Sequence, residues 1–168
     1  INLNFDKSSG ITTVEARNYG YAAGAADTVT VQGVTTATTL KITDDIGGAN
    51  RANNFTVSYS NVSGTADKAS VIVNNTTAAV TLGTITVAGV EDLTVTSSGG
   101  AGASYILTDA DATTASINAA ASSGGTVTAG DLTKVATLNV SSAADLTIDD
   151  NTNKLIKVST VNIDSQTA

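Results

Sequence analysis

A short pattern of alternating polar and apolar residues recurs along the chain at nearly constant spacing. In the second half its first apolar residues, Leu93, Ile117, Leu138 and Val161, lie 24, 21 and 23 positions apart. The earlier copies are Ser70-Val71-Ile72-Val73, 22 positions before Leu93, and Thr39-Leu40-Lys41-Ile42, a further 31 positions back. A sustained period of this length is typical of proteins that stack one structural unit on the next. The longer step from Leu40 to Val71 predicts an insertion there.

The repeat predicts an all-β fold, a parallel β-solenoid with rungs of about 22 residues. Each unit contains short alternating strands separated by turn-forming Gly, Ser, Asn and Asp. Alternation sends every second side chain inward, so Leu93, Ile117, Leu138 and Val161 are expected to stack in one interior column. The outward column is expected to contain Lys41, Thr94, Asn118, Asn139 and Asn162.

Composition agrees with thin, regular layers rather than with one deep core. Aromatic residues make up 4% of the chain, and Trp and Met are absent, so the interior must consist of Val, Ile, Leu and Ala. The many threonines are β-branched and fit a pleated sheet. The absence of Pro suits strands whose backbone N–H groups all take part in sheet ladders.

The repeat divides the chain into two predicted parts. Residues 69–168 hold the register and form the repeat solenoid, whereas residues 1–68 form an irregular all-β N-terminal part. An immunoglobulin-like β-sandwich is the alternative fold, especially for residues 1–68, because it also consists of short alternating strands. Residues 18–26 fit either a loop or a short helix.

Residue content excludes most catalytic classes. The chain has no His and no Cys, so it lacks Ser-His-Asp and Cys-His catalysis and ordinary zinc sites. Glu91 and Asp92 are the obvious carboxylate pair, but adjacent residues of a strand point to opposite faces, which does not suit glycoside hydrolysis. A net charge of -7 disfavours nucleic acid as a partner, and no apolar run is long enough for direct insertion into a membrane. We therefore expect a protein that is not an enzyme.

Acidic turns are the candidate metal sites, with calcium as the cofactor. Calcium prefers six to eight oxygen ligands from carboxylates, amides and carbonyls. The candidate ligands lie in three turn segments: Asp149, Asn151 and Asn153; Asp109 and Asp111; and Asp44 and Asp45. The spacing from Asp109 to Asp149 is close to two repeats and places both groups on one edge of the stack. The alternative is that these residues only form turns.

Two segments carry a resemblance to a known family. Ala88-Gly89-Val90-Glu91-Asp92-Leu93-Thr94-Val95-Thr96-Ser97 and Leu132 through Ser142 resemble the recurring units of Gram-negative surface-layer proteins. The resemblance covers roughly residues 69–168 and implies type I secretion, a calcium-dependent β-solenoid and an extracellular location on the cell surface. The chain lacks the calcium-binding nonapeptide G-G-x-G-x-D of that class, because Gly99-Gly100-Ala101-Gly102-Ala103 is followed by Ser104 and not by Asp.

The resemblance implies a structural component that associates with copies of itself through lateral contacts. The alternative function is a repetitive adhesin stalk or ligand-binding module of a secreted surface protein, with a cell-surface glycan or a host protein as the partner. The two alternatives differ in assembly, since the first forms ordered sheets and the second isolated rods.

Overall fold

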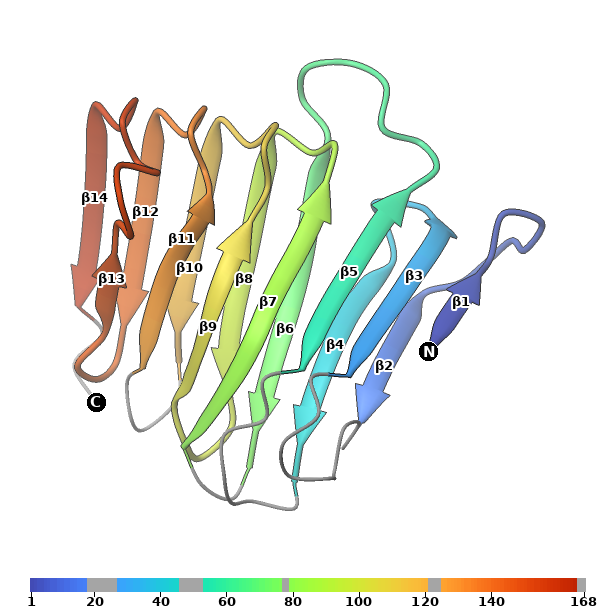
Figure 1. The fold of residues 1–168 in the computed structure, drawn as a ribbon, viewed down its shortest axis with the longest axis horizontal. Helices are drawn as coiled ribbons and strands as arrows, with labels where there is room; N and C mark the ends of the chain where they lie inside the picture. The colour runs from blue at the N-terminus through green and yellow to red at the C-terminus, as the bar shows by residue number, and fades with distance from the viewer. Residues whose placement is uncertain (18–26, 46–52, 77–78, 121–124, 166–168) are drawn as a thin grey trace.

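The computed structural model describes residues 1–17, 27–45, 53–76, 79–120 and 125–165, and the predicted loop or helix at 18–26 lies outside them. The chain winds through about six turns of a parallel β-solenoid with rungs of about 24 residues, and the described residues contain no helix (Figure 1). None of the described segments is a helix that could cross a membrane.

Two parallel seven-stranded sheets form the walls of the solenoid. The first contains, in spatial order, β1 (Asn2–Asn4), β3 (Thr28–Val34), β5 (Asn54–Tyr59), β7 (Val80–Ala88), β9 (Ala103–Thr108), β11 (Thr126–Asp131) and β13 (Thr147–Asp149). The second contains β2 (Thr13–Arg17), β4 (Thr39–Asp44), β6 (Lys68–Asn75), β8 (Asp92–Ser98), β10 (Thr114–Ala119), β12 (Thr137–Ser142) and β14 (Thr160–Ser165).

The core lies between the two sheets and consists mainly of the inward side chains of the strands from β2 to β12. β6 and β8 show strict alternation of buried and half-buried residues, as expected for a strand with one face in a core. Val71 and Val95 are neighbours in the sheet, and both are fully buried. A single rung cannot bury its apolar face, so the neighbours above and below it provide the burial. Full burial of one such side chain contributes about 1.5–3 kcal/mol to folding.

The first residues of the chain belong to the same two sheets. Each of β1 to β5 pairs in parallel with the next strand of its own sheet, so the described residues of 1–68 do not form the immunoglobulin-like sandwich considered as the alternative. Leu40 pairs with Val71, 31 positions later, which confirms the insertion predicted there. The long connection between β5 and β6 bulges from the stack in Figure 1 and accounts for part of this length.

The predicted interior column is wrong at one of its four positions. Leu93 and Leu138 both pair with Ala115, and Leu138 also pairs with Val161. Ile117 lies two residues further along, between Val95 and Val140. The predicted rung length of about 22 residues is shorter than the observed length of about 24 residues. The reason is that the N-terminal rungs are longer than the C-terminal rungs, where the repeat is most regular.

The predicted outward column is also wrong in part, because Asn118 is displaced by two residues along β10, as Ile117 is. Thr94, Ser116, Asn139 and Asn162 share one outward column, whereas Asn118 pairs with Thr96 and Ser141. Lys41 pairs with Ile72 and so belongs to the second column. In the first column the Asn139 side-chain amide donates to the Ser116 hydroxyl at 3.1 Å, and the Asn162 amide donates to the Asn139 amide oxygen at 2.8 Å.

One glycine allows a local irregularity in the first sheet. The pairing of β3 with β5 shifts register between Gln32 and Val34, as at a β-bulge. Gly33 occupies this position with φ of 77°, a backbone conformation that favours glycine. A Cβ at Gly33 would overlap Asp6 in the turn after β1, so this position also requires a residue without a side chain.

Candidate functional site

The acidic residues gather at the turns that lead from the first sheet to the second. We call this side of the solenoid the acidic edge, and it contains Asp67, Glu91, Asp92, Asp109, Asp111, Asp131, Asp149 and Asp150. The edge is the upper one in Figure 1, where each odd-numbered strand ends. It brings together Asp109 with Asp111 in one turn, and Asp149 two rungs further on, as the spacing predicted. Asp44 is the last residue of β4 and Asp45 follows it, so both lie on the opposite edge.

Two acidic side chains of this edge contact a lysine of the neighbouring rung. Lys134 Nζ lies 2.7 Å from Asp111 Oδ1, and Lys68 Nζ lies 2.6 Å from Asp92 Oδ2. These lysines, which the sequence analysis missed, connect adjacent rungs as a bound cation would. Their contacts lower the repulsion among the carboxylates, and hydrogen bonding to the partner acid raises the pKa of both lysines. The spacing of 23 or 24 residues between opposite charges, one rung, is the signal that would have found them.

The turn that begins at Asp149 has a defined local structure. Asp149 Oδ1 accepts a hydrogen bond from Asn151 N at 3.1 Å, and Asp150 Oδ1 accepts one from Leu155 N at 2.7 Å. Asn151, Thr152 and Asn153 all have positive φ, 35°, 71° and 62°. Such a run is uncommon outside glycine, and asparagine tolerates it best. These contacts are those of turn-forming residues, and they leave the second carboxylate oxygens available to other ligands.

Asp109 differs from the other acids because it is fully buried. Its Oδ1 accepts a hydrogen bond from Asp111 N at 3.0 Å, and its Oδ2 has no hydrogen-bond partner. Burial raises the pKa of Asp109 to about 7, with smaller contributions from the negative charges of Asp111 and Glu91. The backbone N–H groups of Asp111 and Ala112 oppose this rise. Asp109 therefore changes its charge near neutral pH.

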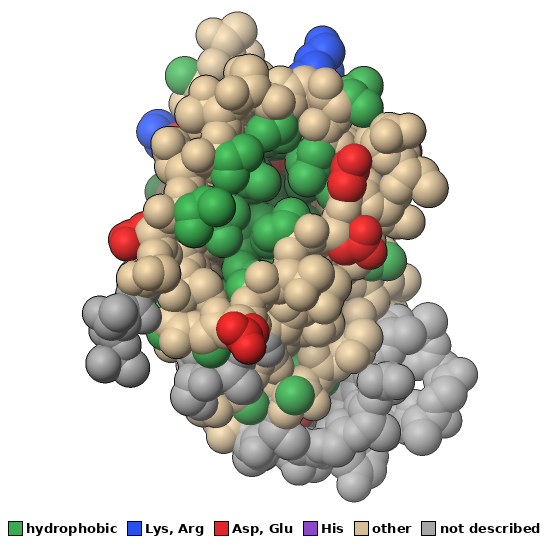
Figure 2. Space-filling view, turned by 90° about the vertical axis from the view of Figure 1, so that its left-hand side faces the viewer, with side chains coloured by type: hydrophobic (Ala, Val, Ile, Leu, Met, Phe, Trp, Pro, Cys, Tyr) green, Lys and Arg blue, Asp and Glu red, His purple; other side chains and the backbone are tan. Residues whose placement is uncertain are grey.

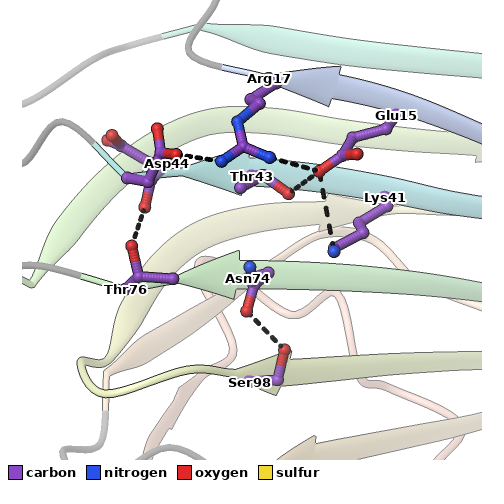
Figure 3. Close-up of polar contacts among 9 residues, drawn as sticks. Glu15, Arg17, Lys41, Thr43, Asp44, Asn74, Thr76 and Ser98 are labelled. Carbon is purple, nitrogen blue, oxygen red and sulfur yellow. Dashed lines mark hydrogen bonds and ion pairs between the residues drawn. The ribbon is translucent and has the colours of Figure 1, made fainter.

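Asp45, from the third predicted acidic group, takes part in an ion cluster with residues of β2 and β4. Arg17 contacts Asp45, and it also lies 3.9 Å from Glu15. Glu15 accepts a hydrogen bond from the Thr43 hydroxyl at 2.5 Å and lies 3.7 Å from Lys41 (Figure 3). The hydrogen bond from Thr43, aided by the charges of Lys41 and Arg17, holds the pKa of Glu15 below its usual value. The cluster thus connects two neighbouring rungs through compensated charges.

The described residues do not contain a group of three or more carboxylates arranged to hold a metal ion. Any calcium would have to combine one or two carboxylates with backbone carbonyls, side-chain amides and water, as hard cations accept. Comparison of the chain with family models, curated proteins and solved structures gives no match, so the site is interpreted from its own geometry.

Proposed function

We propose that the chain is a structural segment of a bacterial cell-surface layer, that it associates laterally with copies of itself, and that it catalyses no reaction. The observation that carries this proposal is the outward surface of the second sheet. There Thr94, Ser116, Asn139 and Asn162 form a straight column of small polar side chains along the stack. A flat wall of repeated hydrogen-bonding groups is suited to lie against an identical wall.

The residues that resemble the surface-layer unit have structural roles that agree with this proposal. Val90, Leu93 and Val95 are fully buried in one rung, and Glu91 accepts a hydrogen bond from Asp67 N of the preceding turn at 2.9 Å. The motif therefore consists of residues that close a rung and connect it to its neighbour. A function that depends on stacking rungs fits this use better than one that depends on a reacting group. On this proposal the protein is secreted and lies outside the cell.

A rod-like adhesin stalk remains the second candidate, because the rungs add along one axis (Figure 1). Electron microscopy of the purified protein on a lipid or carbon support separates the two. The surface-layer proposal predicts ordered two-dimensional sheets, and Asn139→Arg, on the outward wall, should disrupt them. Ile106→Arg, on the other sheet, is the matched control. Dispersed rods at every protein concentration would favour the adhesin stalk, and cleavage of a polysaccharide that depends on one carboxylate would contradict both.

Calcium binding at the acidic edge is part of the same proposal. We expect calcium to raise the midpoint of thermal unfolding, because a divalent cation reduces repulsion between carboxylates of neighbouring turns. A ligand present at a hundredfold excess over its dissociation constant stabilises the folded state by about 2.7 kcal/mol. Magnesium should give less, since it demands a tighter octahedral site.

Differential scanning calorimetry with calcium, with magnesium and with chelator measures this effect. Asp149→Asn and Asp111→Asn should reduce the calcium-dependent shift, and Asp6→Asn, at the far end of the stack, should leave it unchanged. Equal midpoints in the three conditions would mean that these acids only form turns and pair with lysines.

A further inference from the structure

We propose that the outer surface of the first sheet binds ice, through a grid of threonine side chains that holds a layer of ordered water. This function is separate from the lateral association proposed above, because it uses the first sheet and the lateral contact uses the second. Three observations support it: the register of the threonines, the absence of charge on the strands that carry them, and hydroxyl groups without partners in the chain.

A column of four threonines crosses the middle of the first sheet. Thr30 pairs with Thr56, Thr56 with Thr86, and Thr86 with Thr108. Each of them lies between two buried residues of its own strand and therefore faces outward. The four strands lie side by side at the front of Figure 1. The sequence conceals this column, because its members are 26, 30 and 22 positions apart.

A second column runs beside the first, two residues earlier on each strand. It contains Thr28 and Thr84, together with Asn54 and Ile106. Neighbouring strands lie about 4.8 Å apart, and outward residues follow each other at about 6.6 Å along a strand. We call this grid the threonine face. Threonine is stiff at χ1, so each methyl and hydroxyl group is held near a fixed position.

The threonine face is free of charge, although Asp, Glu, Lys and Arg make up 14% of the chain. None of the residues of β3, β5, β7 and β9 is charged, whereas β2, β4, β6 and β8 each contain at least one charged residue. In the view along the stack, the apolar side chains gather between the two walls (Figure 2). A charged group holds a hydration shell of its own. A face without charge leaves the arrangement of its water to the threonines.

The hydroxyl groups of the first column form no hydrogen bond to another described residue of the chain. On the second sheet, by contrast, the amides of Asn139 and Asn162 donate to other side chains of their own wall. A threonine hydroxyl can donate one hydrogen bond to water and accept two, and the methyl group beside it restricts the orientation of neighbouring water.

Water held on such a grid resembles the surface of an ice crystal, where oxygen atoms also repeat regularly with spacings of this size. A layer that is already ordered joins the crystal at little further cost in entropy. Protein bound in this way blocks growth of the ice beneath it, so that the crystal grows only below its melting temperature. The expected activity is therefore a gap between the melting and freezing temperatures.

Osmometry on a single ice crystal in a nanolitre droplet measures this gap. We expect a gap that widens with protein concentration. Thr86→Lys places a strongly hydrated charge at the centre of the threonine face and should abolish the gap. Thr94→Lys is the matched control, because Thr94 is also half-buried and faces outward from β8, the central strand of the second sheet. Thermal unfolding checks that each variant is folded, and Thr56→Lys replaces Thr86→Lys if that variant is not.

Two substitutions separate this activity from the lateral association. Ile106→Arg should reduce the gap and leave the two-dimensional sheets intact, whereas Asn139→Arg should disrupt the sheets and leave the gap unchanged. The proposal is overturned if the unaltered protein shows no gap, if the gap survives in folded Thr86→Lys, or if Thr94→Lys loses it equally. Loss of the sheets in Thr86→Lys without loss of the gap would assign this face to a second copy of the chain, and would overturn the proposal as well.

Discussion

Replacing Leu138 by aspartate should lower the free energy of unfolding by about 3–5 kcal/mol. Leu138 is 5% exposed and lies in the interior column between Ala115 and Val161. An aspartate there would bury a charge with no partner, and it would also remove an apolar side chain from the core. Urea unfolding followed by circular dichroism measures the loss as a lower midpoint.

Asn139→Asp is the control for this change, because Asn139 is the next residue and points outward. The Asn139 amide donates to Ser116, and aspartate would lose that hydrogen bond while still accepting from Asn162. The expected cost is about 1 kcal/mol or less. Equal losses from the two substitutions would show that the assignment of inward and outward faces is wrong.

Stability should fall as pH rises from about 4 to about 7, because Asp109 loses its proton in a buried site. The pKa of Asp109 is raised from 3.8 to about 7 in the folded state, so the folded protein binds more protons than the unfolded chain between these values. Stability therefore decreases with rising pH throughout this window. The full effect is about 4 kcal/mol once the pH exceeds the folded-state pKa. Urea unfolding at a series of pH values measures it.

Asp109→Asn should remove most of this pH dependence, because the amide has no charge to bury. Asp111→Asn is the matched control, since Asp111 lies in the same turn but is only half-buried and is paired with Lys134. The control should keep the slope. A slope that persists in Asp109→Asn, or that vanishes in Asp111→Asn, would assign the titration to another group.

The sequence predicted the fold because it contains both an alternation of polar and apolar residues and a regular repeat of that pattern. Residues 134–140 and 157–163 are similar over seven positions without a gap, which places Leu138 beside Val161, and the structure pairs these two residues. Ile117 was misplaced because β10 alternates over its full length of six residues. A shift by two residues keeps every side chain on its own face, so alternation alone cannot fix the register. Ala115, the true neighbour of Leu93 and Leu138, is small and was overlooked as an interior residue.

The candidate site was predicted less completely than the fold. The sequence placed Asp109 and Asp149 on one edge, since turns recur with the rung. It did not distinguish Asp109, which is fully buried, from Asp111, which is half-buried, because both residues follow the same strand and differ only in how the turn covers them. The contacts of Lys68 and Lys134 depend on side chains reaching across rungs, which the repeat pattern does not describe.

Cross-linking of paired cysteines tests the stacked register most directly, and the chain has no cysteine of its own. Ser116→Cys combined with Asn139→Cys places two thiols on neighbouring strands in one outward column, about 4.8 Å apart along the stack. A short bifunctional thiol reagent should join this pair rapidly and within one chain. Asn118→Cys with Asn139→Cys is offset by two residues and should react slowly. Faster reaction of the offset pair, or no reaction of either, would contradict the parallel solenoid in the register described.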